Sequence, residues 1–558
     1  MATMPTSDQN VIKGRGLVPL NSLVSALMTD MYQITMSYAY WRAGRHNEHA
    51  VFDLFFRKCP FKGQFTVFAG LSEVIALVNS FSFSEEDISY LRTLLPHCED
   101  DFFAWLADLD CRNVRLYAME EGTLCFPRVP LIRVEGPLAV AQLLETPLLN
   151  LINYPSLIAT NAARLRVAAG SDKVMLEFGL RRAQGPDGAL SASRYSYIGG
   201  FNGTSNVLAG KLIGMDVRGT HAHAFVQSYT SFGQIKDPTL DGKDFVAMVK
   251  DYRGRLGNTS SSNDSELAAF TAYAQAFPDG FLALVDTYDT LQSGVPNFLC
   301  VALALDDLGH RALGCRLDSG DLSYLSQEVR RMVTDASKAF ERPFLASTTI
   351  VASNDINEDS LHSLADQGHS IDTFGIGTNL VTCQAQPALG CVYKLVSIEG
   401  MPRIKLSQTT SKITIPGRKW VYRLLSGEGV PILDIMLKDG EDPPQPGDPF
   451  LARRARKRTP CNNKCRLHPF LATKRARVTP SRVVPLQKLV WDGPAGGAIF
   501  DLPTIDEVRA TVARGLEEIR PDTLQRLNPT PYKVSLSEGL HDFLHSLWER
   551  EAPIRELS

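Results

Sequence analysis

The chain has almost no net charge and no long apolar run. Its 58 basic and 61 acidic residues leave a formal charge of -3. A balance so close to neutral argues against a dedicated nucleic-acid binder, although a local basic stripe would still be compatible with it. The most apolar stretch, residues 137–169, is interrupted by Glu145, Asn150, Pro155 and Asn161. A membrane span needs about 18 apolar residues in succession, so we expect a buried helix there and no membrane partner.

Regularly spaced cysteines and an apolar leader are also missing. The ten cysteines follow no repeating pattern, which argues against a disulfide scaffold and favours a reducing compartment. The first sixteen residues are polar and contain no apolar segment of signal-peptide length. These features predict a cytoplasmic protein, in the cytosol. The length of 558 residues allows two or three domains.

The central part of the chain has the pattern of an α/β barrel. Short apolar runs alternate there with helical stretches, which predicts a parallel sheet. About six such units favour a closed or nearly closed barrel over residues 150–410. Residues 1–20 are predicted to be a disordered tail, and residues 21–149 an N-terminal α+β domain. The predicted strand units are residues 173–185, 219–229, 281–290, 311–322, 344–357 and 371–381.

Polar residues gather where each predicted strand ends. In α/β barrels the loops at the strand carboxyl ends converge on one cavity and carry the chemistry. This placement is the strongest architectural indication of a catalytic site in the chain. The residues concerned are Glu177, Arg181, His223, Asp286, Arg316, Asp318, Asp321, Asn354, Gly375 and Gly377.

The segment GCRLDSGDL, residues 314–322, ends an apolar strand in charged residues. Asp318 and Asp321 are suited to the hydroxyls of a ribose or to a hydrated magnesium ion. Arg316 could bind a ligand carboxylate through two hydrogen bonds. A tight Asp-Ser-Gly-Asp turn that closes the strand is the alternative interpretation of the same residues.

The segment FGIGTNL, residues 374–380, places Gly375 and Gly377 between a strand and a helix. Backbone N–H groups in such a turn can surround an anion, and barrel phosphate sites commonly follow the late strands. A glycine-rich turn without a ligand is the plainer alternative.

The segment GTHAHAFV, residues 219–226, contains His221 and His223 two positions apart. They could form a metal pair, or one could accept a phosphoryl group as a nucleophile. One packed and one solvent-facing histidine would be the structural alternative. The other histidines do not follow apolar strands, so the metal interpretation lacks further ligands.

Two charged features have structural alternatives as well. Glu177 precedes Arg181 and Arg182, and the arginines could bind pyrophosphate or a carboxylate. A surface ion pair at a helix start is the alternative. Residues 453–482 are strongly basic, which resembles a nuclear-localisation or polyanion segment but is also typical of a solvated loop. We predict a basic loop there.

Nine long motifs in one order resemble the animal-type nicotinate phosphoribosyltransferase family. The resemblance covers residues 25–440 and continues more weakly to the C-terminus. The motifs are LMTDMYQITM (27–36), FDLFFRKCPF (52–61), LLETPLLNLINY (143–154), LEFGLRRAQGPDG (176–188), YSYIGGFNGTSNVLAG (195–210), GTHAHAFV (219–226), GCRLDSGDL (314–322), FGIGTNLVTC (374–383) and GCVYKLV (390–396).

The resemblance implies a type II phosphoribosyltransferase fold, with an irregular α/β barrel and a second α+β domain. Both chain ends build that second domain, so residues 411–558 would complete it. The implied reaction joins nicotinate to phosphoribosyl pyrophosphate, giving nicotinate mononucleotide and pyrophosphate for NAD biosynthesis. ATP hydrolysis would drive it through a phosphohistidine, with Mg²⁺, or Mn²⁺ in its place, as cofactor. The implied assembly is a homodimer with its active site at the interface.

The resemblance also assigns roles to individual residues. His223 matches the phosphorylated histidine of Gly-Thr-x-Ala-His, although Ala224 stands where the family usually has serine. Asp318 matches an acid near the ribose. The positions for nicotinate are Tyr32 (which stacks on the ring, from the partner subunit), Thr220, Arg316 and Phe178. The positions for phosphoribosyl pyrophosphate are Thr378, Gly375, Gly377, Arg181 and, from the partner subunit, Arg57. The metal ligands are not assigned.

The choice of pyridine base rests on Ser205. Nicotinamide-specific relatives carry aspartate in the corresponding Gly-Thr-Asp loop, where it accepts a hydrogen bond from the amide. Aspartate would repel the carboxylate of nicotinate, and Ser205 does not. The competing interpretations are the nicotinamide-using relative, a quinolinate phosphoribosyltransferase, and a catalytically inactive scaffold. Ser205 disfavours the first, the length and the Gly-Thr-x-Ala-His motif disfavour the second, and the intact residue set disfavours the third.

Overall fold

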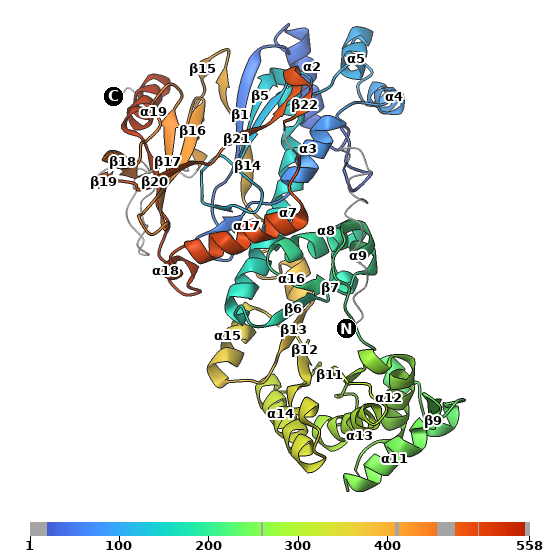
Figure 1. Cartoon of the computed structure of the whole chain (residues 1–558). Coiled ribbons are helices and arrows are strands. Elements are labelled where there is room, and N and C mark those ends of the chain that lie inside the picture. The colour runs from blue at the N-terminus through green and yellow to red at the C-terminus, as the bar shows by residue number, and fades with distance from the viewer. Residues whose placement is uncertain (1–18, 258–260, 408–411, 455–474, 500, 553–558) are drawn as a thin grey trace, which may run out of the picture. The chain divides into compact units, whose positions relative to one another are not determined.

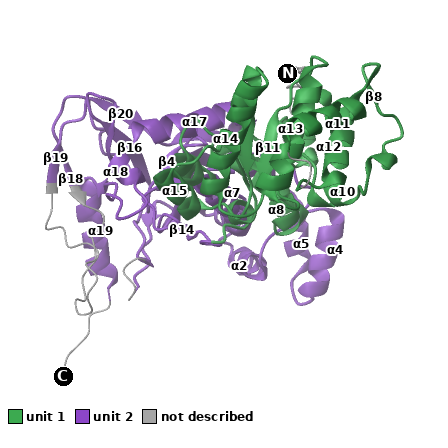
Figure 2. Cartoon of the chain, turned by 90° about the horizontal axis from the view of Figure 1, so that it is seen from below, with its two compact units in different colours: residues 1–12, 162–384 green, residues 13–161, 385–558 purple. Residues whose placement is uncertain are grey.

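The computed structural model describes residues 19–257, 261–407, 412–454, 475–499 and 501–552. The predicted disordered tail, residues 1–20, lies outside these ranges except for its last two residues. Two compact units divide the chain (Figure 2). The described part of the first unit runs from Ala162 to Gln384, and the second unit combines residues up to Asn161 with those from Ala385 onward. These divisions differ from the sequence-based bounds of 150 and 410.

The first unit contains a six-stranded sheet in which all neighbouring strands are parallel. Figure 1 shows β6, β13 and β12 side by side, with α14 (Leu322–Ala339) and α15 (Glu358–Gln367) beside them. Each strand is short, most are apolar, and each is followed by a helix, which is the pattern that predicted a parallel sheet. In sheet order the strands are β10 (Leu282–Leu284), β11 (Gly314–Leu317), β12 (Thr349–Ala352), β13 (Thr373–Ile376), β6 (Val174–Glu177) and β7 (Gly203–Thr204).

The strand predicted at residues 219–229 is wrong. His223 begins a short helix, α10 (His223–Gln227), and the sixth strand of the sheet is β7, which makes a further bridge from Thr204 to Val217. The alternation of histidine and alanine resembled a strand. However, residues His223–Gln227 are helical, and Phe225 in this helix packs against Tyr229, which follows it, at 5.4 Å between ring centroids.

Apolar helices fill the interior of the first unit. Helix α13 (Val295–Asp306) is buried from Val295 to Leu305, as expected for a helix that is apolar on all sides. It contacts α11 (Phe245–Arg255) and α12 (Asp264–Ala276). The remaining helices of the unit include α8 (Gly185–Ile198), α9 (Val207–Ile213) and α16 (Thr378–Thr382).

The second unit has two larger sheets, the first of which combines both ends of the chain, and a short pair of strands, β2 (Thr66–Val67) and β4 (Leu124–Cys125). In order, the first consists of β15 (Met401–Pro402), β14 (Cys391–Ile398), β1 (His49–Phe56), β5 (Ile132–Pro137), β3 (Arg115–Ala118), β21 (Lys488–Asp492) and β22 (Gly497–Ala498). The second consists of β19 (Arg475–Val478), β18 (Phe450–Arg454), β23 (Val534–Leu536), β17 (Pro431–Lys438), β16 (Lys419–Leu425) and β20 (Arg482–Pro485). The predicted second α+β domain built from both chain ends is therefore confirmed.

Helices accompany these sheets. The helix predicted from the spacing of large apolar groups after Thr29 and Asp30 is α2 (Met31–Arg42), and Asp30 and Gln33 form a capping box at its start. The apolar stretch at 137–169 forms α6 (Leu138–Leu143) and α7 (Glu145–Ala169). Within the described ranges, no helix is long and apolar enough to cross a membrane. The other helices of this unit are α3 (Leu71–Asn79), α4 (Glu85–Leu94), α5 (Asp100–Ala107), α17 (Ile505–Glu518), α18 (Pro521–Leu524) and α19 (Glu538–Glu551).

The segment predicted as a basic loop, residues 453–482, is not a loop at its ends. Strands β18 and β19 pair antiparallel across it, with Arg453 opposite Arg475 and Phe450 opposite Val478, and β20 begins at Arg482. Strand β19 lies at the edge of its sheet, and the neighbouring residues Ala476 and Arg477 are both exposed. Residues 455–474 lie outside the described ranges.

His310 clamps a hairpin of the first unit. Its Nδ1 lies 2.9 Å from Asp279 and its Nε2 2.8 Å from Asp241, which is in the turn between β8 (Thr239–Leu240) and β9 (Lys243–Asp244). Hydrogen bonds to Asp279, then to Asp241, raise the pKa of His310 above its usual value. The clamp is therefore strongest when the imidazole is protonated.

We expect His310→Gln to lower the Tm most at low pH. Since the folded-state pKa is raised, the stabilisation is fully present below the unfolded-state pKa of about 6.5 and is lost as pH rises through the folded-state value. The Tm difference between wild type and His310→Gln should be largest near pH 6 and smallest near pH 9. Calorimetry across that range measures it, and a difference that grows with pH would contradict the clamp.

Candidate active site

Carboxylates meet at the carboxyl edge of the parallel sheet in the first unit. Asp286 follows β10, Asp318 follows β11 and Ser353 follows β12. The backbone N–H of Asp318 donates to Asp286 Oδ2 at 2.8 Å, and the Ser319 hydroxyl donates to the same oxygen at 2.6 Å. The Ser353 hydroxyl donates to Asp318 Oδ1 at 2.6 Å. These bonds fix both carboxylates in place, as the convergence of parallel strand ends predicts.

The imidazole of His223 lies over this carboxylate pair. Its Nδ1 is 3.0 Å from the Thr287 hydroxyl. Its Nε2 is 3.8 Å from Asp318 Oδ2 and 3.9 Å from Asp286 Oδ1. The His223 side chain is 39% exposed, whereas that of Asp286 is 2% exposed. The ring is thus oriented through Nδ1 and presents Nε2 toward solvent and two acidic oxygens.

Arg316 is a half-buried cation with an unused donor. It lies on β11, its Nη1 donates to the Thr220 hydroxyl at 2.9 Å, and its buried Nε has no hydrogen-bond partner. Burial lowers the pKa of Arg316, and Arg181 lowers it further, while Asp318 and Asp286 raise it. Because a buried N–H group is costly to leave unpaired, this arrangement suits an anionic ligand that supplies the missing acceptor.

The glycines of the 374–380 segment permit close packing by Phe178. A Cβ on Gly375 would lie 2.4 Å from the Phe178 ring, and one on Gly377 would lie 3.1 Å from the Phe178 carbonyl oxygen. The half-buried Phe178 ring therefore rests on β13, and the exposed Thr378 begins α16 directly after. The structure shows this packing role, while the phosphate-binding role of these glycines stays a prediction.

Glu177 is a buried structural link and not half of a surface ion pair. Its side chain is fully buried and accepts hydrogen bonds from the hydroxyls of Ser193 at 2.8 Å and Thr204 at 2.6 Å, and from the Gly179 N–H. It thereby joins the end of β6 to α8 and β7. Arg181 is exposed, and its positive charge contributes to lowering the pKa of Arg316.

His221 packs into the core and does not share a metal with His223. Its Nε2 accepts from the Leu284 N–H at 3.3 Å, and its ring lies 4.8 Å from that of Tyr273. Burial lowers the pKa of His221 to about 4, so the ring is neutral at physiological pH. Among the described residues, no cluster of three or more His, Cys, Asp or Glu side chains has a metal-binding arrangement.

Two predicted site residues belong to the second unit. Tyr32 lies on α2 and is 46% exposed. Arg57 follows β1 and is half-buried, and its N–H donates to the Gly390 carbonyl at 3.0 Å. Their roles in substrate binding stay predictions.

The sequence reasoning missed Thr287 and Ser353, which hold His223 and Asp318. Thr287 follows β10 by three residues, in VDT, and Ser353 follows β12 by one, in ASN. Position after a strand could have identified them, but hydroxyl residues are so common in loops that this signal is weak.

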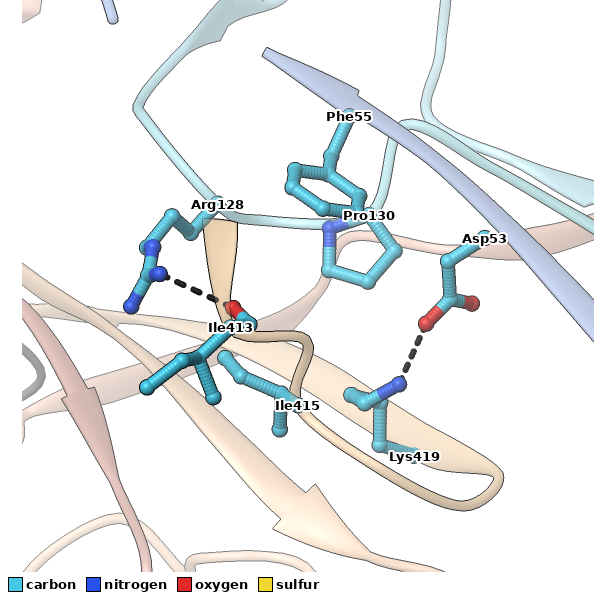
Figure 3. Close-up of a pocket in the computed structure, with 7 residues that line it drawn as sticks. All are labelled: Asp53, Phe55, Arg128, Pro130, Ile413, Ile415 and Lys419. Atoms are coloured by element: carbon cyan, nitrogen blue, oxygen red, sulfur yellow. Dashed lines mark hydrogen bonds and ion pairs between the residues drawn. The ribbon is translucent and has the colours of Figure 1, made fainter. Parts of the chain in front are cut away.

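A hollow in the second unit is lined by none of the active-site residues that the sequence predicts (Figure 3). Lys419 and Asp53 form an ion pair with side chains 1% and 3% exposed, and Arg128 Nη2 donates to the Ile413 carbonyl at 3.0 Å. Burial lowers the pKa of Lys419, against the opposing effect of Asp53. These contacts join β1 to β16 and its preceding loop, which is a structural role. The hollow is lined by Asp53, Phe55, Arg128, Pro130, Ile413, Ile415 and Lys419.

The structure is similar to solved phosphoribosyl-group enzymes over most of its length. It matches the crystal structure of human nicotinic acid phosphoribosyltransferase with a TM-score of 0.81 and 42% identity, covering 93% of this chain and 99% of that one. A nicotinate-nucleotide pyrophosphorylase from Pyrococcus furiosus matches with a TM-score of 0.57 and 20% identity, over 93% and 99% of the two chains, which shows a common fold. The fold is that of the type II phosphoribosyltransferases.

Sequence comparison identifies the family within that class. Models of the nicotinate phosphoribosyltransferase N-terminal domain, family region and C-terminal domain match residues 27–153, 174–427 and 418–544. Nicotinate phosphoribosyltransferase 1 of Arabidopsis thaliana is 52% identical over 97% of this chain and 96% of its own. The Homo sapiens relative is 45% identical over 94% and 97%. The chain belongs to the nicotinate phosphoribosyltransferase family and is an enzyme.

Proposed function

We propose that this enzyme joins nicotinate to phosphoribosyl pyrophosphate, giving nicotinate mononucleotide and pyrophosphate for NAD biosynthesis, and that ATP hydrolysis is coupled to it through phosphorylation of His223. The observation that carries the proposal is the arrangement of His223, Asp318 and Arg316 at one sheet edge. Family membership supports the choice of nicotinate as substrate.

Arg316 is the proposed anchor for the nicotinate carboxylate. Its unpaired Nε and its Nη1, which Thr220 orients, provide directed donors for a planar anion. The partner subunit's Tyr32 and Phe178 of this chain would hold the pyridine ring between aromatic faces. With the carboxylate held, the ring nitrogen can attack C1 of the ribose.

We propose that phosphoribosyl pyrophosphate binds on the side of the site opposite to nicotinate. Departure of pyrophosphate leaves positive charge on the ribose, which the Asp318 carboxylate would stabilise. Arg181 and the partner subunit's Arg57 would neutralise the leaving group. Thr378 with the Gly375 and Gly377 amides would bind the phosphates. The bond from C1 to the pyrophosphate oxygen breaks as the bond from C1 to the pyridine nitrogen forms.

Transfer from ATP to His223 is the proposed coupling step. Neutral Nε2 attacks the γ-phosphorus, ADP leaves, and water later hydrolyses the phosphohistidine to phosphate. Thr287 holds Nδ1 and so aims Nε2 outward. Phosphohistidine formation would reshape the anion site and tighten substrate binding, and its loss would favour release of product.

Magnesium, with manganese as substitute, is the proposed metal. The buried Asp286 Oδ1 has no hydrogen-bond partner, and Asp318 lies beside it. Two carboxylate oxygens suit Mg²⁺, which usually completes its shell with water and substrate phosphates. When bound, the ion would neutralise phosphate charge next to these acids.

Ser205→Asp is expected to shift the base preference from nicotinate toward nicotinamide. An aspartate there would repel the nicotinate carboxylate and accept a hydrogen bond from the amide. The ratio of kcat/KM values for the two bases should fall about tenfold or more, since each 1.4 kcal/mol of differential binding is a factor of ten. Ser205→Asn is the control, because asparagine is uncharged and has the same size as aspartate. An unchanged ratio would remove Ser205 from the specificity argument.

The experiment that tests the proposed function compares the two bases with and without ATP. Purified full-length enzyme is given phosphoribosyl pyrophosphate and Mg²⁺, and nucleotide product and ADP are measured together. Product from nicotinate only, with ADP release and a higher rate with ATP, would support the proposal. No product from either base would overturn it and favour an inactive scaffold.

Two features accompany this proposal. We propose that the enzyme is a homodimer, in which the partner subunit's Tyr32 and the partner subunit's Arg57 would contribute to the active site. We also propose a location in the cytosol. A mixture of Tyr32→Ala, which would bind nicotinate poorly, and His223→Ala, which would lack stimulation by ATP, should regain ATP-stimulated transferase activity if the two residues serve one site from different chains. No regained activity after subunit exchange would argue for a site within one chain.

A further inference from the structure

A fully buried polar group lies behind the loop that orients His223. Glu266 on α12 accepts hydrogen bonds from the Ser293 hydroxyl at 2.5 Å and from Asn297 Nδ2 at 2.9 Å. The three residues are at most 2% exposed. Ser293 belongs to a π-helical turn, residues Thr290–Gly294, and Asn297 lies in the first turns of α13. π-turns are rare and occur frequently at functional sites.

The Ser293 hydroxyl is both a donor and an acceptor of hydrogen bonds. Its hydroxyl donates to Glu266 and accepts from the Asn263 N–H at 2.8 Å. Asn297 Nδ2 also donates to the Asn263 carbonyl at 3.0 Å. The start of α12, where Asn263 is the capping residue, is thereby fastened to the π-turn through side chains that exclude water.

The π-turn ends the loop that carries the His223 contacts. This loop, residues 286–294, begins with Asp286 and Thr287, whose side chains lie against the two nitrogens of His223. Asp289 closes its middle, since its Oδ1 accepts from the N–H groups of Leu291 and Gln292. At its end, a Cβ on Gly294 would lie 1.8 Å from the Val285 carbonyl oxygen, so the loop returns directly onto the strand that it left. A shift of the π-turn would therefore move Asp286 and Thr287.

We propose that Glu266 is a positioning residue for phosphorylation of His223, which holds loop 286–294 in place through Ser293 and Asn297. The inference rests on the proposed function, since it assigns Glu266 to the same histidine. Glu266 does not touch His223 or a substrate, and it acts by limiting where Thr287 and Asp286 can lie. Partners that orient metal-ligating side chains commonly change metal affinity or activity by about 10- to 100-fold when removed, and we expect an effect of that order for Glu266.

The charge state of Glu266 guides the choice of variant. Burial raises the pKa of Glu266 to about 7; the hydrogen bonds from Ser293 and Asn297 lower it, and Asp286 and Asp289 raise it. Glu266 Oε1 and Asn297 Oδ1 are both buried acceptors without a hydrogen-bond partner, and a proton on Glu266 would relieve one of them. Glutamine, which is neutral and keeps one acceptor oxygen, is thus the conservative replacement.

The test measures phosphohistidine formation in Glu266→Ala and Glu266→Gln. We expect Glu266→Ala to slow phosphorylation of His223 by ATP about tenfold or more. The KM for nicotinate measured without ATP should stay within about twofold of wild type, because Arg316 and Thr220 lie on other elements. Glu266→Gln should restore most of the rate. Hydrogen exchange of residues 286–294 should be faster in Glu266→Ala than in wild type.

Thr271→Val is the matched control. Thr271 is equally buried on α12, but its hydroxyl donates to Leu267 of the same helix at 2.7 Å and does not link α12 to loop 286–294. Its variant should keep the wild-type phosphorylation rate. Equal losses in Thr271→Val, a wild-type rate in Glu266→Ala, or failure of Glu266→Gln to restore the rate would each overturn the inference.

Ser293→Ala tests the same link if Glu266→Ala does not fold. It removes one hydroxyl and should slow phosphorylation in the same way, and an unchanged rate would overturn the inference. Absence of phosphohistidine in the wild-type enzyme would instead refute the proposed coupling. In that case hydrogen exchange of residues 286–294 still tests the role of Glu266. If exchange were unchanged in both Glu266→Ala and Ser293→Ala, Glu266 would not hold the loop.

Discussion

His223→Ala is expected to abolish phosphorylation by ATP and to reduce the ATP-stimulated rate to the rate that wild type shows without ATP. The substitution removes Nε2, the atom that Thr287 aims at the solvent-exposed side of the carboxylate pair. No neighbouring side chain named in the site can replace it, because Asp286 and Asp318 are fixed by hydrogen bonds from Ser319 and Ser353. Transfer without ATP should continue, since Arg316, Thr220 and Asp318 are unchanged.

The measurement is incorporation of γ-labelled phosphate together with the rate of nucleotide formation with and without ATP. His362→Ala provides a control, since His362 is a half-buried histidine on α15 of the same unit and should leave both quantities unchanged. If ATP still stimulated His223→Ala, or if the variant still incorporated label, His223 would not be the phosphorylated residue.

Arg316→Lys is expected to lower kcat/KM for nicotinate about 10- to 100-fold, because a hydrogen bond to a charged group contributes about 1.5–3 kcal/mol and each 1.4 kcal/mol is a factor of ten. Lysine keeps the charge but offers no planar fork, so it loses the directed Nε and the Nη1 contact to Thr220. The effect should be smaller for nicotinamide, which has no carboxylate. The ratio of kcat/KM for nicotinate to that for nicotinamide should therefore fall.

Steady-state kinetics with both bases measures this prediction. Arg331→Lys is the matched control, because Arg331 is exposed on α14 and pairs with Glu328 at the surface, where the charge contributes little. A kcat/KM for nicotinate in Arg316→Lys within about twofold of wild type would show that the guanidinium geometry does not recognise the carboxylate.

The family, the class of fold and the gathering of polar residues at one sheet edge could be predicted from the sequence. Strands such as RALGCRL and IDTFGI are short, apolar and followed by helices, and this pattern is local in the chain. The parallel sheet then brings the ends of its strands together by geometry alone. That is why Asp286, Arg316 and Asp318, which are separated by as many as 32 residues, could be expected to lie near one another.

Other features depended on partners distant in sequence. The pattern assigned β14 to the barrel segment, yet it pairs with β1, more than 330 positions away, and so belongs to the second unit. Residues 219–229 alternate like a strand, but contacts of Phe225 with Tyr229 and His221 stabilise a helix start instead. Glu177 resembled a surface acid beside two arginines, and only the positions of Ser193 and Thr204 show that it is buried.

The sequence by itself determined which residue types are available and in what order: the motifs that define the family, the strand and helix periods, and the charged residues that follow the strands. Only the tertiary structure decided which of these residues touch, which face of His223 is free, and that Glu266 fastens the loop behind it. The physical reason is that periodicity and turn chemistry act over a few residues, whereas burial and hydrogen-bond partners depend on segments joined by packing across the chain.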